Sequence, residues 1–405
     1  MLKKYFLNNK KRNFSTALIW IKGGSDMDST GKKGINKILC SLLTRGCEGF
    51  NNFTLSEYIE SYGAELNQEI FEDGISISIK SLNEHFSKLF PLLDLIINKP
   101  ILSETEFKKV KKSSIDHIKK DKENPFNICF EKWRKIVYSN HPYAFNTIGN
   151  ANDVSKITYE DVLLEFKNLK NREKYLISNN PEINGENFGT LEKKILKEKS
   201  DPLNHNLNTT NRFDYINNDS NQTIIMMGDQ TCSRRSSEYF PLKVLESYLS
   251  YGMSAALFKL FREKHGITYD LGVYYPIRSG NAPFLIYLSV SNDQALFAFE
   301  LLSTLWKNLL LNPLTDAEIF LAKEKLKGSF LLGNQSLDEI LQRKIQLVSY
   351  GISPISENDL NSKIEEISSL DILKLTNKYF SKPFLSISGN KNICLEISNR
   401  WKKNF

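Results

Sequence analysis

The sequence predicts an α+β fold made of two tandem, similar domains, each a mostly antiparallel sheet with helices packed on one face. Three observations lead to this fold class. At 405 residues, the chain exceeds the size of one ordinary hydrophobic core. Short alternating strand patterns are followed by longer helical patterns in both halves. The order strand, helix, proline, capping box and helix occurs twice, with Glu106 in the first series matched by Glu318 in the second.

The first half of the chain alternates between strand and helix patterns. "FSTALIWIK" at 14–22 predicts a strand that ends at a glycine pair. "GISISIKSL" at 74–82 alternates strictly, as a strand with one buried face does. The other elements expected here are a short strand at 173–180 and helices at 34–46, at 54–67 with Gly63 as C-cap, at 83–99 and from Ser103 onward.

A segment rich in Asn, Gly and Ser, residues 183–222, separates the two series. The second series consists of strands at 222–228 and 284–291 and helices at 238–250, at 294–313 and from Thr315 onward. We therefore expect an N-terminal domain over residues 1–185, an Asn-rich linker over 186–215 and a C-terminal domain over 216–405.

Composition narrows the class of protein. The net charge of +7 is a mild excess of dispersed lysines, so we expect no nucleic-acid partner. The five cysteines form no Cys-x-x-Cys pair, which favours reduced thiols in the cytoplasm. No apolar run is long enough for a membrane helix, and the only apolar stretch near the N-terminus, residues 17–21, is too short for a signal peptide. We expect no membrane partner.

One helix pattern contains an anomaly. "GINKILCSLLTRG" at 34–46 has the apolar spacing of a helix with one buried face. Lys37, Cys40 and Ser41 are polar or weakly polar positions within this pattern. The question is why a helix that packs on a core carries these residues there.

Four stretches, taken together, resemble the insulinase/pitrilysin family of zinc peptidases. They are "GGSDMD" with "GINKILCSLLTRG", then "YIESYGAELN", "HPYAFNTIGNANDVSKITYEDV" and "YGMSAALFKLFREKHGITYDLGVYYP". Active members of this family carry the inverted zinc motif His-x-x-Glu-His and a later Glu as third ligand. By the resemblance, Lys37 and Ser41 occupy the two His positions, Cys40 the base position and His117 the later Glu position.

None of these four residues keeps the chemistry of its position. A lysine ammonium cannot bind a metal unless it loses its proton, and serine is a poor zinc ligand. Cys40 and His117 would be two ligands without a third. We therefore expect no metal and no other cofactor in this chain, and we interpret 34–46 as a metal-site helix whose ligands have been replaced.

The resemblance keeps two catalytic positions in the second half, Arg262 and Tyr269 of "REKHGITY". It implies that Tyr269 donates a hydrogen bond to the developing oxyanion and that Arg262 holds negative charge of the substrate or transition state. The alternative from the residues alone is that Arg262 pairs with an acid and Tyr269 fills the core. The pattern also predicts that the helix ends at Gly266 and the chain then enters a strand.

Relatives of similar length often act as two-chain enzymes in which one subunit binds zinc and the other carries the Arg/Tyr pair. The resemblance thus implies a heterodimer with a zinc-bearing insulinase-like subunit, a chamber enclosed by two halves, and unfolded peptides as substrates. The alternative is a non-catalytic scaffold of the same fold, like the core subunits of respiratory ubiquinol–cytochrome c reductase. An autonomous metallopeptidase would require ligands that this chain does not have.

Overall fold

The structure is a computed structural model, and it describes residues 2–7, 12–187, 211–332, 336–352 and 357–405. Most of the expected linker therefore lies outside the described residues. The chain forms two compact units. The described residues of the first unit are 2–7, 12–120, 145–187 and 336–352, and those of the second unit are 121–144, 211–332 and 357–405. Two segments, 121–144 and 336–352, thus belong to the unit built mainly from the other half of the chain, an exchange that the continuous ranges 1–185 and 216–405 do not anticipate.

The first unit is built on a six-stranded sheet with the order β3-β4-β2-β5-β1-β6. The strands are β1 (Leu2–Phe6), β2 (Phe14–Lys22), β3 (Glu65–Ile70), β4 (Gly74–Leu82), β5 (Lys174–Ser178) and β6 (Glu186–Asn187). The pairs from β3 to β5 are antiparallel, and β1 pairs in parallel with β5 and β6. The strands predicted at 14–22 and 74–82 are confirmed and pair with each other, with Ile19 opposite Ile77.

A large apolar cluster joins one face of this sheet to the helices that cover it. These helices are α1 (Ile35–Leu43), α2 (Asn52–Ser61), α3 (Asn83–Leu89), α4 (Pro91–Asn98), α5 (Glu104–Asp121), α7 (Ala151–Lys156) and α8 (Tyr159–Lys170). The single helix predicted over 83–99 is wrong: it is two helices, because Pro91 lacks the N–H that an uninterrupted helix needs and begins α4 instead.

The opposite face of the first sheet is covered by α13 (Leu337–Ser349). Leu341 and Ile345 of this helix form a second apolar cluster with Leu18 and Trp20 of β2. Thr16 also donates a 2.8 Å hydrogen bond from its hydroxyl to the carboxylate of Asp338. Because neighbouring residues of a strand point to opposite faces, β2 serves both clusters and is buried along nearly its whole length.

The second unit is built on a five-stranded sheet with the order β7-β11-β8-β10-β9. Its strands are β7 (Phe213–Asn217), β8 (Gln222–Gln230), β9 (Thr268–Tyr274), β10 (Pro283–Ser291) and β11 (Phe384–Gly389). Only the pair of β7 and β11 is parallel. The remaining helices of this unit are α10 (Tyr239–Ser250), α11 (Ala295–Leu311), α12 (Asp316–Leu332), α14 (Glu357–Glu365), α15 (Ser369–Phe380) and α16 (Lys391–Asn404), with α6 (Pro125–Tyr138) on the exchanged segment.

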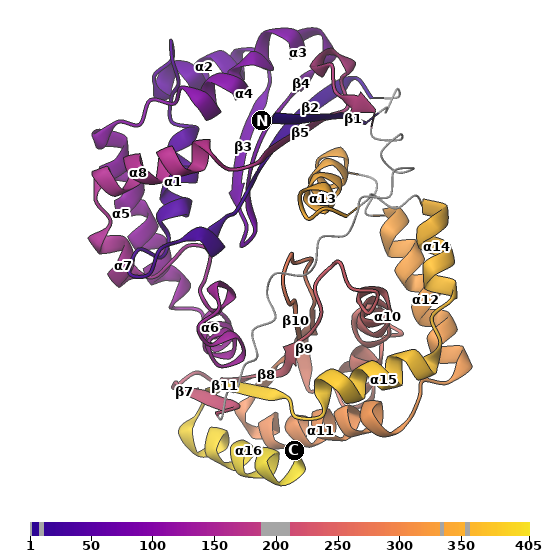
Figure 1. Cartoon of the computed structure of the whole chain (residues 1–405). Coiled ribbons are helices and arrows are strands. Elements are labelled where there is room, and N and C mark those ends of the chain that lie inside the picture. The colour runs from indigo at the N-terminus through magenta and orange to yellow at the C-terminus, as the bar shows by residue number, and fades with distance from the viewer. Residues whose placement is uncertain (1, 8–11, 188–210, 333–335, 353–356) are drawn as a thin grey trace. The chain divides into compact units, whose positions relative to one another are not determined.

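The two faces of the second sheet are also covered unequally (Figure 1). On one face, Phe130 of α6 makes an edge-to-face contact with Tyr274 of β9. On the other, the ring centre of Tyr275, the next residue along the chain, lies 5.5 Å from the ring centre of Tyr239 of α10 in a tilted contact. The predicted α+β class with two similar halves is confirmed. In each unit, most helices cover one face, and one helix from the other half of the sequence covers the opposite face.

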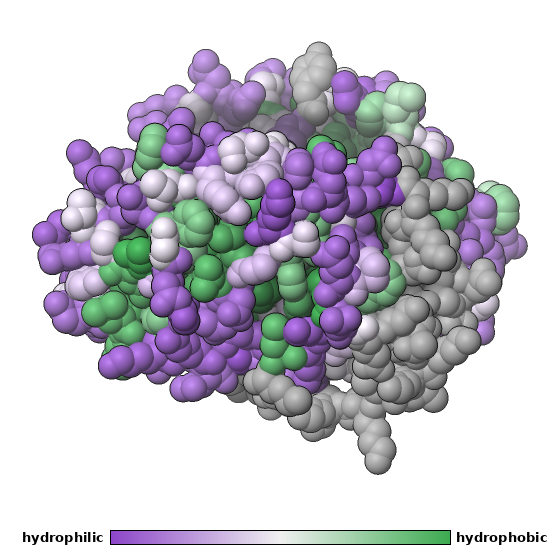
Figure 2. Space-filling view, turned by 90° about the horizontal axis from the view of Figure 1, so that it is seen from above, coloured by the Kyte–Doolittle hydropathy of each residue, from purple (hydrophilic) through white to green (hydrophobic). Residues whose placement is uncertain are grey.

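No helix within the described ranges is long and apolar enough to cross a membrane. On the face seen in Figure 2, patches of hydrophobic side chains lie between hydrophilic ones. Exposed apolar side chains in the first unit include Phe53 and Leu164, and those of the second unit include Met253, Phe320 and Leu321. Of these side chains, Leu321 also lines a cavity that is described below.

Candidate functional site

The helix with the degenerate motif, α1, starts at a glycine that no other residue could replace without strain. Gly34 has a φ of 99°, and a Cβ at this position would lie 2.7 Å from the carbonyl oxygen of Ile148. The Asp28 carboxylate caps the helix by accepting hydrogen bonds from the N–H groups of Gly34 (2.7 Å) and Asn36 (3.1 Å). Burial raises the pKa of Asp28 to about 6 despite these bonds.

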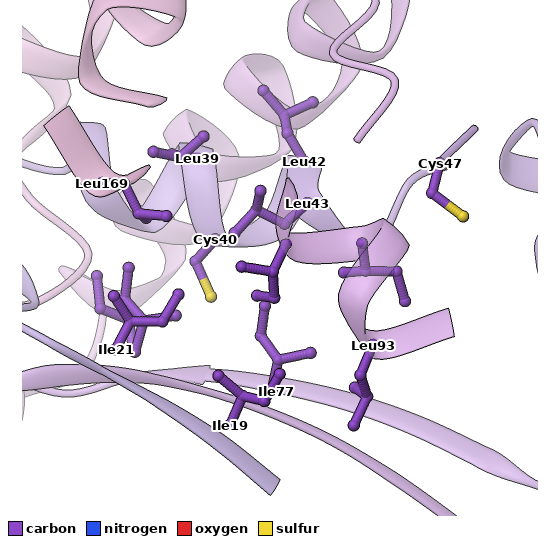
Figure 3. Packing of buried hydrophobic residues seen from close by; sticks show 14 of the residues in the cluster. Ile19, Ile21, Leu39, Cys40, Leu42, Leu43, Cys47, Ile77, Leu93 and Leu169 are labelled. Carbon is purple, nitrogen blue, oxygen red and sulfur yellow. The ribbon is translucent and has the colours of Figure 1, made fainter. Parts of the chain in front are cut away.

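Cys40, which the resemblance places at the base position of the motif, is a core residue. Its exposed fraction is 0%. Figure 3 shows the Cys40 sulfur pointing from α1 toward the strands that carry Ile21 and Ile77. Burial raises the pKa of this thiol to about 12, only partly opposed by the charge of Lys37. Cys40 therefore stays protonated at neutral pH and cannot take a proton from water as the glutamate of the family motif does.

The other three motif positions do not form a metal site. Lys37 and Ser41 are half-buried on α1, and His117 is exposed on α5. Lys37 lies near Glu69 of β3, whose pKa is raised by burial and partly lowered again by the lysine charge. Within the described parts of the chain, no hydrogen bond or ion pair joins Lys37, Ser41 and His117, and no three His, Cys, Asp or Glu residues are grouped so that they could hold a metal. The residues at the motif positions do not fit zinc.

Arg262 lies on a π-helix, Phe258–Lys264, in the second unit. Its side chain is exposed, with the guanidinium carbon 5.0 Å from the ring centre of Phe258. The helix ends as predicted: Gly266 has a φ of 62°, and the N–H of Ile267 donates to the carbonyl oxygen of Phe261 over 3.0 Å. This bond closes the left-handed turn at Gly266, after which the chain enters β9.

Tyr269 occupies a β-bulge at the start of β9. Val290 of β10 lies opposite Thr268, and Ser289 lies opposite Asp270, so Tyr269 is the additional residue between them. The buried hydroxyl of Thr268 supports the bulge, since its Oγ1 lies 3.0 Å from the carbonyl oxygen of Asp270. Bulges occur beside active sites because they redirect side chains. The side chain of Tyr269 itself lies outside what the structure describes.

A cavity of about 670 Å³ runs beside this bulge. Its lining includes His265, Thr268, Asp270 and Gln222. Tyr269 and Arg262 are seven residues apart, with the left-handed turn at Gly266 between them. Thr268 and Asp270 were not singled out from the sequence. The polar run "TYD" at the start of a strand, which breaks the alternation of buried and exposed residues, is the feature that could have revealed them.

Two family models match the chain. Residues 5–151 match the insulinase family, peptidase family M16, and residues 182–326 match the peptidase M16 inactive domain. Among curated relatives, an uncharacterized zinc protease of Rickettsia felis is 23% identical over 370 residues, which cover 89% of this chain and 88% of the relative. An uncharacterized zinc protease of Bacillus subtilis is 22% identical over 385 residues, which cover 92% of this chain and 93% of the relative.

Solved structures have the same fold. A crystal structure of a peptidase M16 inactive domain from Pseudomonas fluorescens has a TM-score of 0.81 at 20% identity, covering 96% of this chain and 95% of that chain. A protease from Helicobacter pylori has a TM-score of 0.80 at 17% identity, covering 95% of this chain and 96% of that chain. With both family models matching in sequence order, and with no His-x-x-Glu-His in the sequence, this chain belongs to the insulinase family of peptidases and lacks its zinc motif.

Proposed function

We propose that this chain is the non-zinc subunit of a two-chain peptidase of the cytoplasm that cleaves unfolded peptides. The partner is a zinc-bearing insulinase-like subunit of similar length. Tyr269 donates its hydroxyl to the oxyanion that develops on the scissile carbonyl, and Arg262 holds negative charge of the substrate or transition state. Arg262 and Tyr269 act only with the partner, so the chain alone is inactive.

The contrast between α1 and the segment 258–270 carries this proposal. Cys40 is fully buried, and its thiol keeps its proton at neutral pH, which removes the general base of the motif. Arg262, by contrast, is exposed on a π-helix, and the backbone of Tyr269 forms a bulge. π-Helices and bulges are often found at functional sites. A chain that served only as a scaffold would need neither feature.

Peptide binding is supported by an open sheet edge in the first unit. β3 is the edge strand of its sheet within the described residues, and β4 is its partner on the inner side. Glu65 and Glu69 are exposed along it, so charged side chains keep the edge soluble. An extended peptide can pair with the outer backbone groups of such a strand. This mode of binding requires an unfolded substrate.

The test is reconstitution. A fluorogenic peptide is incubated with this chain, with a zinc-bearing insulinase-like subunit from the same genome, and with both, and the zinc content of each chain is measured. We expect chelator-sensitive cleavage only in the mixture, and less than about 0.1 zinc per molecule of this chain after reloading. A mixture in which the partner's motif glutamate is replaced by glutamine controls for contaminating peptidases.

Two results would contradict the proposal in different ways. Chelator-sensitive cleavage by this chain alone, with about one tightly held zinc, would show an autonomous peptidase. Formation of a stable complex with no cleavage would instead support the scaffold function.

A complex that contains the Arg262→Lys variant of this chain tests the role of the guanidinium, because an ammonium cannot replace its planar fork. We expect the complex with this variant to be inactive.

A further inference from the structure

A second cavity, of about 330 Å³, lies in the second unit away from Tyr269. It is bordered by the π-helix Phe258–Lys264 and by α10, α11 and α12. Much of its lining is apolar, and it includes Ala256, Leu260, Leu305 and Leu321. Leu321 is 40% exposed, so the apolar wall continues onto the surface of α12. A concave apolar site with a few polar groups is the usual form of a small-molecule site.

Three lysines line the same cavity: Lys259, Lys264 and Lys325. In the described part of the chain, none of them has an ion-pair partner. On the same helix, α12, Lys327 pairs with Glu324 over 2.7 Å, whereas Lys325 has no such pair among the described residues. Three lysines from two segments, the π-helix and α12, thus line one largely apolar cavity.

The single carboxylate in the lining, Glu318, is already engaged. One oxygen accepts a 3.0 Å hydrogen bond from the hydroxyl of Tyr248. The other accepts from the N–H of Thr315 over 2.9 Å, as part of the capping box that starts α12. Partial burial raises the pKa of Glu318, but these bonds and the charge of Lys259 lower it below its usual value, so the carboxylate is ionised at neutral pH. One negative charge against three positive charges leaves the cavity with an excess of positive charge.

The lysines also affect one another. The pKa of Lys325 is lowered, first by partial burial and then by the charge of Lys259. Two ammonium groups are thus close enough to repel while both border the same apolar walls. An anion between them would relieve this repulsion, and an apolar chain attached to the anion would cover Leu260 and Leu305.

We propose that this cavity binds a small carboxylate anion with an aliphatic chain. The carboxylate lies among Lys259, Lys264 and Lys325, and the chain lies against the leucines of the wall. Apolar burial contributes about 25 cal/mol per Å² of covered surface, and charge-assisted hydrogen bonds fix the position of the head group. The site contains neither Arg262 nor Tyr269, so the inference does not depend on the proposed function.

Isothermal titration of the full chain with sodium octanoate tests the proposal. We expect a Kd of about 0.1–1 mM, because about ten non-hydrogen atoms can supply this affinity. 1-Octanol has the same chain without the charge, and acetate has the charge without the chain. Both should bind at least about tenfold more weakly.

Variants then locate the site. Lys259→Gln and Lys325→Gln should each weaken octanoate binding by about tenfold. Lys167→Gln removes an exposed lysine in the first unit and should leave the affinity unchanged. Ala256→Leu fills the cavity and should abolish binding while all three lysines remain.

Three outcomes would overturn the proposal: no binding of octanoate up to about 10 mM, equal binding of 1-octanol, or equal loss with Lys167→Gln. A variant that fails to fold is recognised by circular dichroism. In that case, the comparison of octanoate, 1-octanol and acetate on the unmodified chain still decides whether an anionic amphiphile is selected.

Discussion

The helix α1 of the first unit and the segment 258–270 of the second unit both carry candidate catalytic positions, but the two segments differ in structure. In α1, Cys40, which the resemblance places at the position of the catalytic base, is completely buried. In the second segment, Arg262 is exposed on a π-helix, and Tyr269 lies at a bulge. The comparison shows that a helix without catalytic residues can remain part of the core, because apolar packing is enough to stabilise it there.

The irregular segment needs another explanation. A π-helix and a bulge both interrupt regular hydrogen bonding, so packing alone gives no reason for them. Thr268 stabilises the bulge with a buried hydroxyl, and Gly266 supplies the left-handed turn before it. Thr268 and Gly266 thus fix the path of the backbone around Tyr269 rather than add apolar packing to the core. Four experiments can break or sharpen this contrast.

The largest effect is expected for Cys40→Glu, which puts the family's base residue back on α1. The carboxylate would lie in the apolar cluster, so we expect a loss of about 4 kcal/mol in the free energy of unfolding. Cys40→Ala leaves only a small cavity and should cost about 1–2 kcal/mol. Urea denaturation measures both. If the glutamate variant is as stable as the alanine variant, the site around residue 40 accommodates a carboxylate. That result would contradict the interpretation of Cys40 as a core residue.

Tyr269→Phe should lower kcat of the reconstituted heterodimer by about 10²–10³, which is about 3–4 kcal/mol of transition-state stabilisation. Since the hydrogen bond to the oxyanion forms mainly in the transition state, KM should change little. Tyr215→Phe, on β7, makes the same chemical change elsewhere in the unit and is the control. A Tyr269→Phe heterodimer with normal kcat would mean that the bulge has only a structural role.

The pH dependence of stability tests the cap of α1. Burial raises the pKa of Asp28 from 3.8 to about 6 in the folded state. The folded state therefore binds this proton more tightly than the unfolded chain does. The protonation of Asp28 therefore stabilises the folded state fully below a pH of about 4, and this stabilisation is lost as the pH rises through about 6. The free energy of unfolding falls by about 3 kcal/mol at most.

Asp28→Asn removes the titration but keeps an acceptor for α1. Urea denaturation of both proteins from pH 4 to 8 should show the unmodified chain losing stability relative to the variant as the pH increases. All other titrating groups are the same in both proteins, so the difference between the two curves reports on Asp28 alone. Parallel curves would show that Asp28 titrates normally and that the cap is exposed to water.

The smallest effect is expected for Thr268→Val. The isosteric change removes one buried hydroxyl and should cost about 1 kcal/mol of folding free energy. Thr304→Val, on the exposed side of α11, removes a hydroxyl that bonds Glu300 and should stay within about 0.5 kcal/mol. If the bulge positions Tyr269, kcat of the heterodimer falls with Thr268→Val and not with Thr304→Val. Equal kcat values would separate the bulge from catalysis.

Much of the fold could be predicted because periodicity is a local property. Strand 74–82 alternates, strand 14–22 ends at a glycine pair, and Gly63 and Gly266 end helices with positive φ, as expected. β3 was not predicted, because Glu65, Asn67 and Glu69 form a polar edge strand with little apolar alternation. Pro91 was passed over as a break, although proline at the start of a helix is a local pattern that the sequence already contains.

The sequence by itself determined the α+β class, the doubled series of elements and the loss of the metal ligands, since each depends on residue type and spacing. Only the tertiary structure decided that Cys40 is buried, that Tyr269 lies at a bulge and that α6 and α13 each cover the sheet of the unit built mainly from the other half of the chain. Burial and strand register depend on contacts between residues far apart in the chain. Such contacts leave no periodic pattern, so they become visible only when the distant segments are packed together.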